Sequence, residues 1–181
     1  MHLKFGSFTS KLLLCIFFCL GGGWLTGLIT QYGVKKWYPH LIKPYGTPPD
    51  ITFPIVWTIL YISMAISLAL LWDSNRNAKS KGKAFLFFGV QLGLNFIWSW
   101  LFFYLQRPGL ALLDIICLWT TLLLTIIYLW EQTRLGSLLL FPYLLWVTYA
   151  AYLNLFIGFI IECFPKCKKL LQTTLQKLFV P

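Results

Sequence analysis

Charged residues are scarce in this sequence: Asp, Glu, Lys and Arg together make up 11% of its 181 residues. Soluble domains average about 25% charged and about 45–50% apolar residues, whereas 59% of this chain is hydrophobic. A chain of this length cannot bury so much apolar surface from water, so lipid must solvate a large part of it. The shortage of charge excludes an ordinary soluble globule and predicts an integral membrane protein.

Histidine is almost absent, with only His2 and His40 in the chain. Neither stands near a nucleophile, and no carboxylate dyad is evident, which argues against a conventional enzyme. His40 as an axial ligand of haem iron is a minor alternative to a solvated loop histidine. We therefore assign no catalytic residue and no metal site from polar motifs.

Cysteines with metal-site spacing are also lacking. Cys15, Cys19 and Cys117 lie inside apolar runs, where a thiol behaves as a small hydrophobic group. Cys163 and Cys167 have lysines but no histidine or further cysteine beside them. Neither a disulfide framework nor a bound metal is predicted.

Acidic residues number five against fifteen lysines and arginines, for a formal charge of +10. Such a charge suggests nucleic acid in a soluble protein. Here the basic residues lie between and after apolar runs, which indicates anchoring to anionic lipid headgroups and no nucleic-acid partner. Seven basic residues would lie on one side of the membrane and eight on the other, so they do not decide the orientation.

Long apolar runs are what the sequence has instead. A membrane-spanning helix needs about 20 mostly apolar residues. Five runs qualify, and they predict an all-α bundle of five transmembrane helices within residues 1–162. A basic amphipathic tail is expected at 163–181. The predicted helices cover residues 12–30, 53–72, 85–105, 110–130 and 138–161.

The connection at 31–52 is far longer than two antiparallel helices need. Five of the nine prolines fall between Pro39 and Pro54, in "PHLIKPYGTPPDITFP". Long ordered loops tend to carry function. We therefore expect this segment to do more than join two helices.

Aromatic and amide residues recur at helical spacing on three of the predicted helices. Ordinary helix packing explains most aromatic stripes, and this interpretation stays open here. The amides Gln91 and Asn95 weigh against packing alone, because buried amides in a bilayer usually bond across a helix interface or a site. The stripes are Phe53–Trp57–Tyr61, Gln91–Asn95–Trp98 and Tyr143–Trp146–Ala150–Leu153.

Glycine in the first helix forms a G-x-x-x-G pair, Gly23 and Gly27. This spacing lets another backbone come close. It fits a dimer seam, a pocket wall of bare backbone, or ordinary packing inside the bundle.

Four stretches, taken together, carry a family resemblance: "WYPHLIKPYGTPPDITFPIVWTILY", "QLGLNFIWSWLFF", "ALLD" and "PYLLWVTYAAYLN". In this order and spacing they resemble the tryptophan-rich sensory protein family, also called translocator protein or peripheral-type benzodiazepine receptor. The similarity covers about Gly22 to Asn154. It implies a five-helix membrane bundle, a homodimer, and a pocket closed by the first loop, with residues 31–52 as a lid that the prolines stiffen.

The resemblance also implies ligands and site residues. Family members bind porphyrins, and some bind sterols or benzodiazepine-type drugs. A porphyrin or haem would be a ligand here, with no cofactor required, and its carboxylates would reach a basic rim at Lys36 or Lys43. Tyr61 is added because it shares the face of Trp57. The implied ligand-binding residues are Gly27, Leu28, Phe53, Trp57, Tyr61, Asn95, Trp98, Trp146, Ala150 and Leu153.

Vertebrate members carry a tyrosine–arginine pair after the final Leu-Asn, but here "LFIGFIIECF" follows Leu153-Asn154. This favours a bacterial-type tetrapyrrole receptor or translocator over a sterol binder, and the bacterial cell membrane over the mitochondrial outer membrane. Light-dependent porphyrin breakdown involving Trp57 and Trp146 is the alternative. A scaffolding protein, with its aromatics used only for packing, is a further one.

Overall fold

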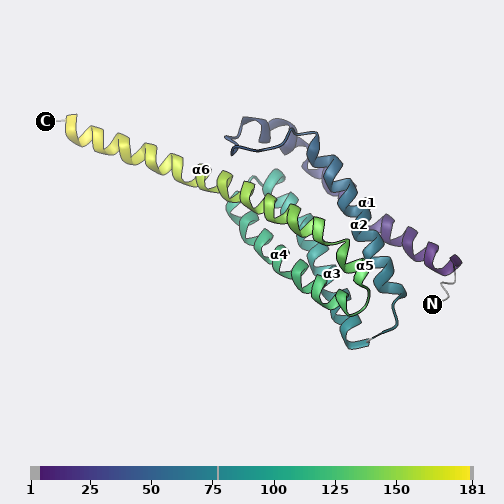
Figure 1. The fold of residues 1–181 in the computed structure, drawn as a ribbon. Coiled ribbons are helices and arrows are strands. Elements are labelled where there is room, and N and C mark those ends of the chain that lie inside the picture. The colour runs from purple at the N-terminus through teal and green to yellow at the C-terminus, as the bar shows by residue number, and fades with distance from the viewer. Residues whose placement is uncertain (1–4, 77, 180–181) are drawn as a thin grey trace.

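The computed structural model describes the backbone of residues 5–76 and 78–179, and the side chains of residues 8–160 except residue 77. Every regular element in this part of the chain is helical (Figure 1). Five helical segments are long and apolar enough to cross a membrane. This confirms the predicted all-α bundle of five transmembrane helices. The elements are α1 (Phe5–Lys36), η1 (Tyr38–His40), α2 (Thr52–Asp73), α3 (Ala78–Ser99), η2 (Trp100–Tyr104), α4 (Pro108–Trp130), α5 (Arg134–Leu138) and α6 (Phe141–Phe179).

The long helices pack as neighbours along much of their length. α1 lies along α2, α3 along α4, and α4 along α6 (Figure 1). Side chains such as Phe88, Leu118 and Tyr143 are fully buried between them. Phe17 and Leu145 are 70% and 71% exposed, as expected for a surface that hydrocarbon rather than water solvates.

The first helix is longer than hydropathy predicts. α1 continues past residue 30 to Lys36, so the connection to α2 is residues 37–51 rather than 31–52. Polar Gln31 and Lys35 end the apolar run, but they are good helix formers and do not end the helix. The α-helix ends at Lys36, and Pro39 lies in the 3-10 turn η1 that follows, where its missing backbone N–H cannot continue the α-helical hydrogen bonds.

The last helix also differs from the predicted range 138–161. Residues 134–138 form the short α5, which Thr133 caps by accepting a 3.3 Å hydrogen bond from the Gly136 amide. α6 then continues without a break to Phe179 (Figure 1). The predicted basic tail, residues 163–181, therefore begins inside this helix. Whether it is amphipathic depends on side chains that lie outside the described residues.

At Gly33 the backbone of α1 lies directly against η2, a π-helical turn. A Cβ atom at Gly33 would overlap the carbonyl oxygen of Phe103, which is backbone and cannot swing aside. A Cβ added at Gly27, by contrast, would meet no described heavy atom within 4 Å outside its own stretch of helix. Only glycine fits at residue 33.

We expect Gly33→Ala and Gly27→Ala to change thermal stability in opposite directions. Alanine in a helix is otherwise favoured over glycine by roughly 0.5–1 kcal/mol, and Gly27→Ala should gain that amount. Gly33→Ala must displace backbone, so its melting temperature in detergent should fall. Equal melting temperatures for the two variants would contradict the α1–η2 contact.

Candidate functional site

A cavity of about 760 Å³ lies between α1 and α2. The end of α3, η2 and the α1–α2 loop (residues 37–51) complete its walls. Pockets for drug-sized ligands span about 300–1,000 Å³ and are lined mostly by apolar side chains. The volume and the largely aromatic and aliphatic lining both fit a ligand site.

The structure brings six of the ten predicted ligand-binding residues to this cavity. The other four are not among the described residues that line it, and they take up separate positions in the helix bundle. The cavity-lining residues are Gly27, Leu28, Phe53, Trp57, Tyr61 and Trp98. The four set apart are Asn95, Trp146, Ala150 and Leu153.

Gly23 and Gly27 both border the cavity. A Cβ at Gly23 would overlap the ring of Tyr61, so the glycine makes room for that ring. At Gly27 the missing side chain leaves open space. Within the single chain, the G-x-x-x-G pair therefore forms a bare-backbone wall of the cavity.

Asn95 is fully buried and bonds within the bundle. Its Oδ1 accepts a 2.6 Å hydrogen bond from the hydroxyl of Tyr61, and its Nδ2 donates to the hydroxyl of Tyr143 at 3.0 Å. The amide joins α2, α3 and α6 and fixes the Tyr61 ring at the cavity wall. Asn95 is thus a positioning residue in this structure.

Trp98 lines the cavity with its ring and uses its N–H elsewhere. Its Nε1 donates to Oδ1 of Asn154 at 3.0 Å, and Asn154 Nδ2 donates to the carbonyl oxygen of Pro108 at 2.7 Å. These bonds hold α3, α4 and α6 together. The Trp98 indole is therefore locked in orientation, and only its apolar surface faces the cavity.

Trp146 on α6 packs edge-to-face against Phe53, with ring centroids 5.9 Å apart. Phe53 lines the cavity, whereas Trp146 does not. The buried Nε1 of Trp146 has no hydrogen-bond partner in the described part of the chain. Trp57 lies on the cavity itself and packs against Tyr61 and Tyr143, at 5.7 and 6.2 Å. Of these two tryptophans, Trp57 therefore borders the cavity and Trp146 does not.

Ala150 and Leu153, also on α6, are buried in the bundle at 6% and 5% exposure. Neither is among the described residues that line the cavity.

The α1–α2 loop closes one end of the cavity and is tied down on two sides. Tyr38 packs against Phe53 and Phe103, with centroids 6.0 and 5.6 Å apart. The hydroxyl of Tyr149 on α6 donates to the carbonyl oxygen of Gly46 at 2.9 Å. Gly46 has φ +87°, a left-handed conformation that favours glycine. The loop is thus an ordered cover.

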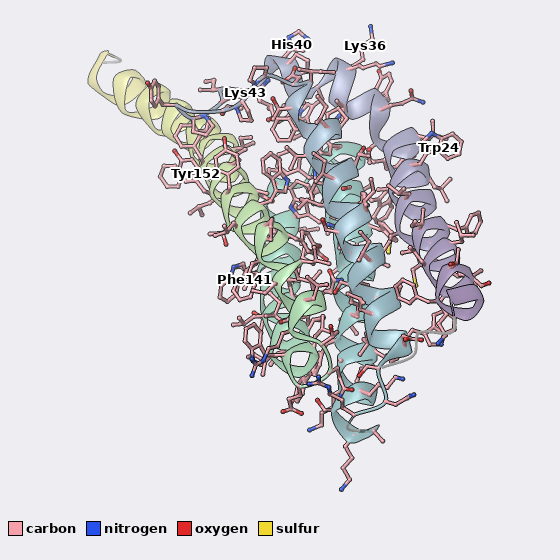
Figure 2. All side chains as sticks on the ribbon, turned by 45° about the vertical axis from the view of Figure 1, so that its right-hand side comes forward. Trp24, Lys36, His40, Lys43, Phe141 and Tyr152 are labelled. Carbon is pink, nitrogen blue, oxygen red and sulfur yellow. The ribbon has the colours of Figure 1, made fainter. Side chains whose placement is uncertain are left out.

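Basic residues gather at this loop end. Figure 2 places Lys36, His40 and Lys43 there. Lys43 forms a 3.1 Å ion pair with Asp50, and its Nζ lies 4.1 Å from the centroid of the Tyr38 ring. His40 is exposed and is not among the described residues lining the cavity.

Sequence reasoning did not select several of the described lining residues, among them Trp24, Gln31, Lys35 and Asp50. Trp24, Leu28, Gln31 and Lys35 recur every three or four residues and so share one face of α1. That spacing could have identified them. A helix predicted to end at residue 30 leaves Gln31 and Lys35 off this face.

These features define a multi-pass membrane protein with a ligand-sized cavity between its first two helices, under an ordered loop. Residues 15–160 match the TspO/MBR family, and the chain belongs to this family. It is 42% identical to a "Tryptophan-rich protein TspO" of Archaeoglobus fulgidus, over 80% of this chain and 92% of that protein. It is 31% identical to the human "Translocator protein", over 66% of this chain and 71% of that protein. A relative from Rhodobacter capsulatus, 35% identical over 71% of this chain and 79% of its own length, is named "Protein CrtK". The family resemblance is confirmed.

Proposed function

We propose that the protein is a receptor or translocator that binds a tetrapyrrole, or a similar flat hydrophobic molecule, in the cavity between α1 and α2. The observation that carries this proposal is the lining: Phe53, Trp57 and Trp98 present aromatic surface to a space of about 760 Å³. Aromatic pairs gain about 0.5–1.5 kcal/mol beyond the area they bury. A flat conjugated ring therefore suits this wall better than a branched aliphatic ligand of equal volume.

The names of relatives support a role in moving or sensing such a ligand. One relative is named "Translocator protein" and another "Tryptophan-rich sensory protein". Both bacterial and animal relatives occur. The bacterial cell membrane as location and a homodimer as the assembly remain part of this proposal, drawn from the family resemblance.

Light-dependent porphyrin breakdown is the second candidate. Of the two tryptophans named for this alternative, Trp57 borders the cavity, whereas Trp146 does not and packs against Phe53. If the photochemical step uses one of these two indoles in contact with the ligand, that indole is Trp57. Direct contact between a ligand in the cavity and Trp146 would require the Phe53 ring to move.

Protoporphyrin titration of the purified protein tests the proposal. Binding in darkness should quench tryptophan fluorescence, and Trp57→Phe should weaken binding roughly two- to tenfold, because a smaller ring stacks less. Trp119→Phe is the control, since Trp119 on α4 bonds to Thr148 on α6, away from the cavity. Irradiation of the complex then separates a receptor from a photochemical catalyst by the loss of the porphyrin spectrum.

Two outcomes would count against the cavity. Absence of porphyrin binding by the parent protein would remove the proposed function. Equal affinity of Trp57→Phe and the parent, with Trp146→Phe weakened instead, would move the ligand to the α2–α6 side of Phe53.

A further inference from the structure

The cavity has an apolar body and a polar end. Its α1 wall begins at Leu20, passes Trp24 and Leu28, and ends at Gln31 and Lys35. With a rise of about 1.5 Å per residue, Lys35 lies roughly 18 Å along the helix axis from Gly23. Thr26 and Thr30, which also line it, donate their hydroxyls to backbone carbonyls of α1, at 2.8 and 2.9 Å. Polar side chains available to a ligand therefore concentrate at the loop end.

The charges at this end do not balance. Asp50 lines the cavity, but Lys43 already pairs with it at 3.1 Å. Lys43 is further held over the Tyr38 ring. Lys35 also lines the cavity and forms no ion pair among the described residues. One cationic side chain at the cavity is thus left without a counter-charge.

We propose that Lys35 recognises an anionic group on the ligand. The ligand class is a flat apolar molecule that carries a carboxylate at one edge, with its ring against Trp57 and Phe53 and its carboxylate on the Lys35 ammonium. This inference rests on the proposed function and adds a chemical requirement to it. It also selects Lys35 over Lys36 and Lys43, the two lysines that the sequence suggested.

The physical reason is the cost of placing an anion in hydrocarbon. A free carboxylate cannot enter the apolar body of the cavity without losing its hydration. Such a ligand must therefore keep its carboxylate at the loop end. There the charge-assisted hydrogen bond to an ammonium offsets part of that loss. Gln31, one turn before Lys35 on the same face, supplies an amide within the same polar end.

Lys35 also has a plain structural interpretation. It stands in the last turn of α1, where a cation is favourable for the helix dipole. Lys36 has the same type, charge and exposure in that turn, but it does not line the cavity within the described part of the chain. Comparing substitutions at Lys35 and Lys36 therefore distinguishes a contact with the ligand from a general effect of charge at the helix end.

The test compares Lys35→Gln and Lys36→Gln with two probes, protoporphyrin IX and its dimethyl ester, in neutral detergent. The parent should bind the diacid roughly three- to fivefold more tightly than the ester, the size expected for a single exposed charge pair. Lys35→Gln should lose this preference while keeping its affinity for the ester. Lys36→Gln should retain the preference, and about 1 M salt should weaken it in the parent.

The outcomes separate the two proposals. If the parent binds both porphyrins equally, or if Lys35→Gln still prefers the diacid, the anion-recognition role is wrong and porphyrin binding stands. If Lys36→Gln loses the preference as fully as Lys35→Gln, a general helix-end charge explains it and the inference is wrong. If neither porphyrin binds the parent, the proposed function itself fails. Melting temperatures of both variants should match the parent, because both side chains are exposed.

Discussion

Asn95→Leu is expected to give one of the largest losses of stability of any single substitution in this protein. The variant removes two hydrogen bonds, from Tyr61 and to Tyr143, and leaves both hydroxyls in the bundle. Hydrogen bonds between membrane helices average about 0.6 kcal/mol. An unsatisfied buried polar group costs about 1–3 kcal/mol. We therefore expect a loss of about 1–4 kcal/mol, measured as a lower melting temperature in detergent by circular dichroism.

A triple variant supplies the control for this prediction. Replacing both partners of a hydrogen bond by apolar groups of similar shape can be nearly neutral. Tyr61→Phe and Tyr143→Phe added to Asn95→Leu should therefore recover most of the lost melting temperature. If Asn95→Leu melts like the parent, the network does not stabilise the bundle. If the triple variant melts lower still, the two hydroxyls have other partners.

The sequence predicts the positions of the helices well, because the hydrocarbon layer requires each spanning helix to be a continuous apolar run. About 20 apolar residues must be continuous, and predicted bounds such as 53 and 130 fall at or beside the observed ones, Thr52 and Trp130. The end of α1 is an exception. Gln31 and Lys35 leave the apolar pattern, yet backbone hydrogen bonds continue to Lys36, and hydropathy does not report backbone hydrogen bonds.

Helical spacing identifies residues that share a face, but it does not say what the face contacts. Phe53, Trp57 and Tyr61 share a face of α2, and all three border the cavity. Trp146 and Ala150 share a face of α6 in the same way, yet that face packs into the bundle behind Phe53. The difference lies in what stands opposite each face in the folded bundle, and spacing along a single helix does not encode that.

Gly27 on α1 and Ala150 on α6 give opposite predictions when a larger side chain replaces the small one. A Cβ at Gly27 would meet no described heavy atom within 4 Å outside its own stretch of helix, and Gly27 borders the cavity. We expect Gly27→Phe to lower porphyrin affinity at least about tenfold, because the added ring occupies the volume that the ligand needs. Its melting temperature should stay close to that of the parent, since the Cβ has free space and the ring has the cavity to occupy.

Ala150 is the matched comparison. It is 6% exposed and belongs to the packed core, where overpacking costs about 1–3 kcal/mol. Ala150→Phe should therefore lower the melting temperature, while the folded fraction still binds porphyrin within about threefold of the parent. Both quantities come from the same samples, by circular dichroism and by fluorescence titration normalised to folded protein. If Ala150→Phe abolishes binding with an unchanged melting temperature, and Gly27→Phe binds normally, then the ligand lies between α2 and α6, and the cavity beside α1 is not its site.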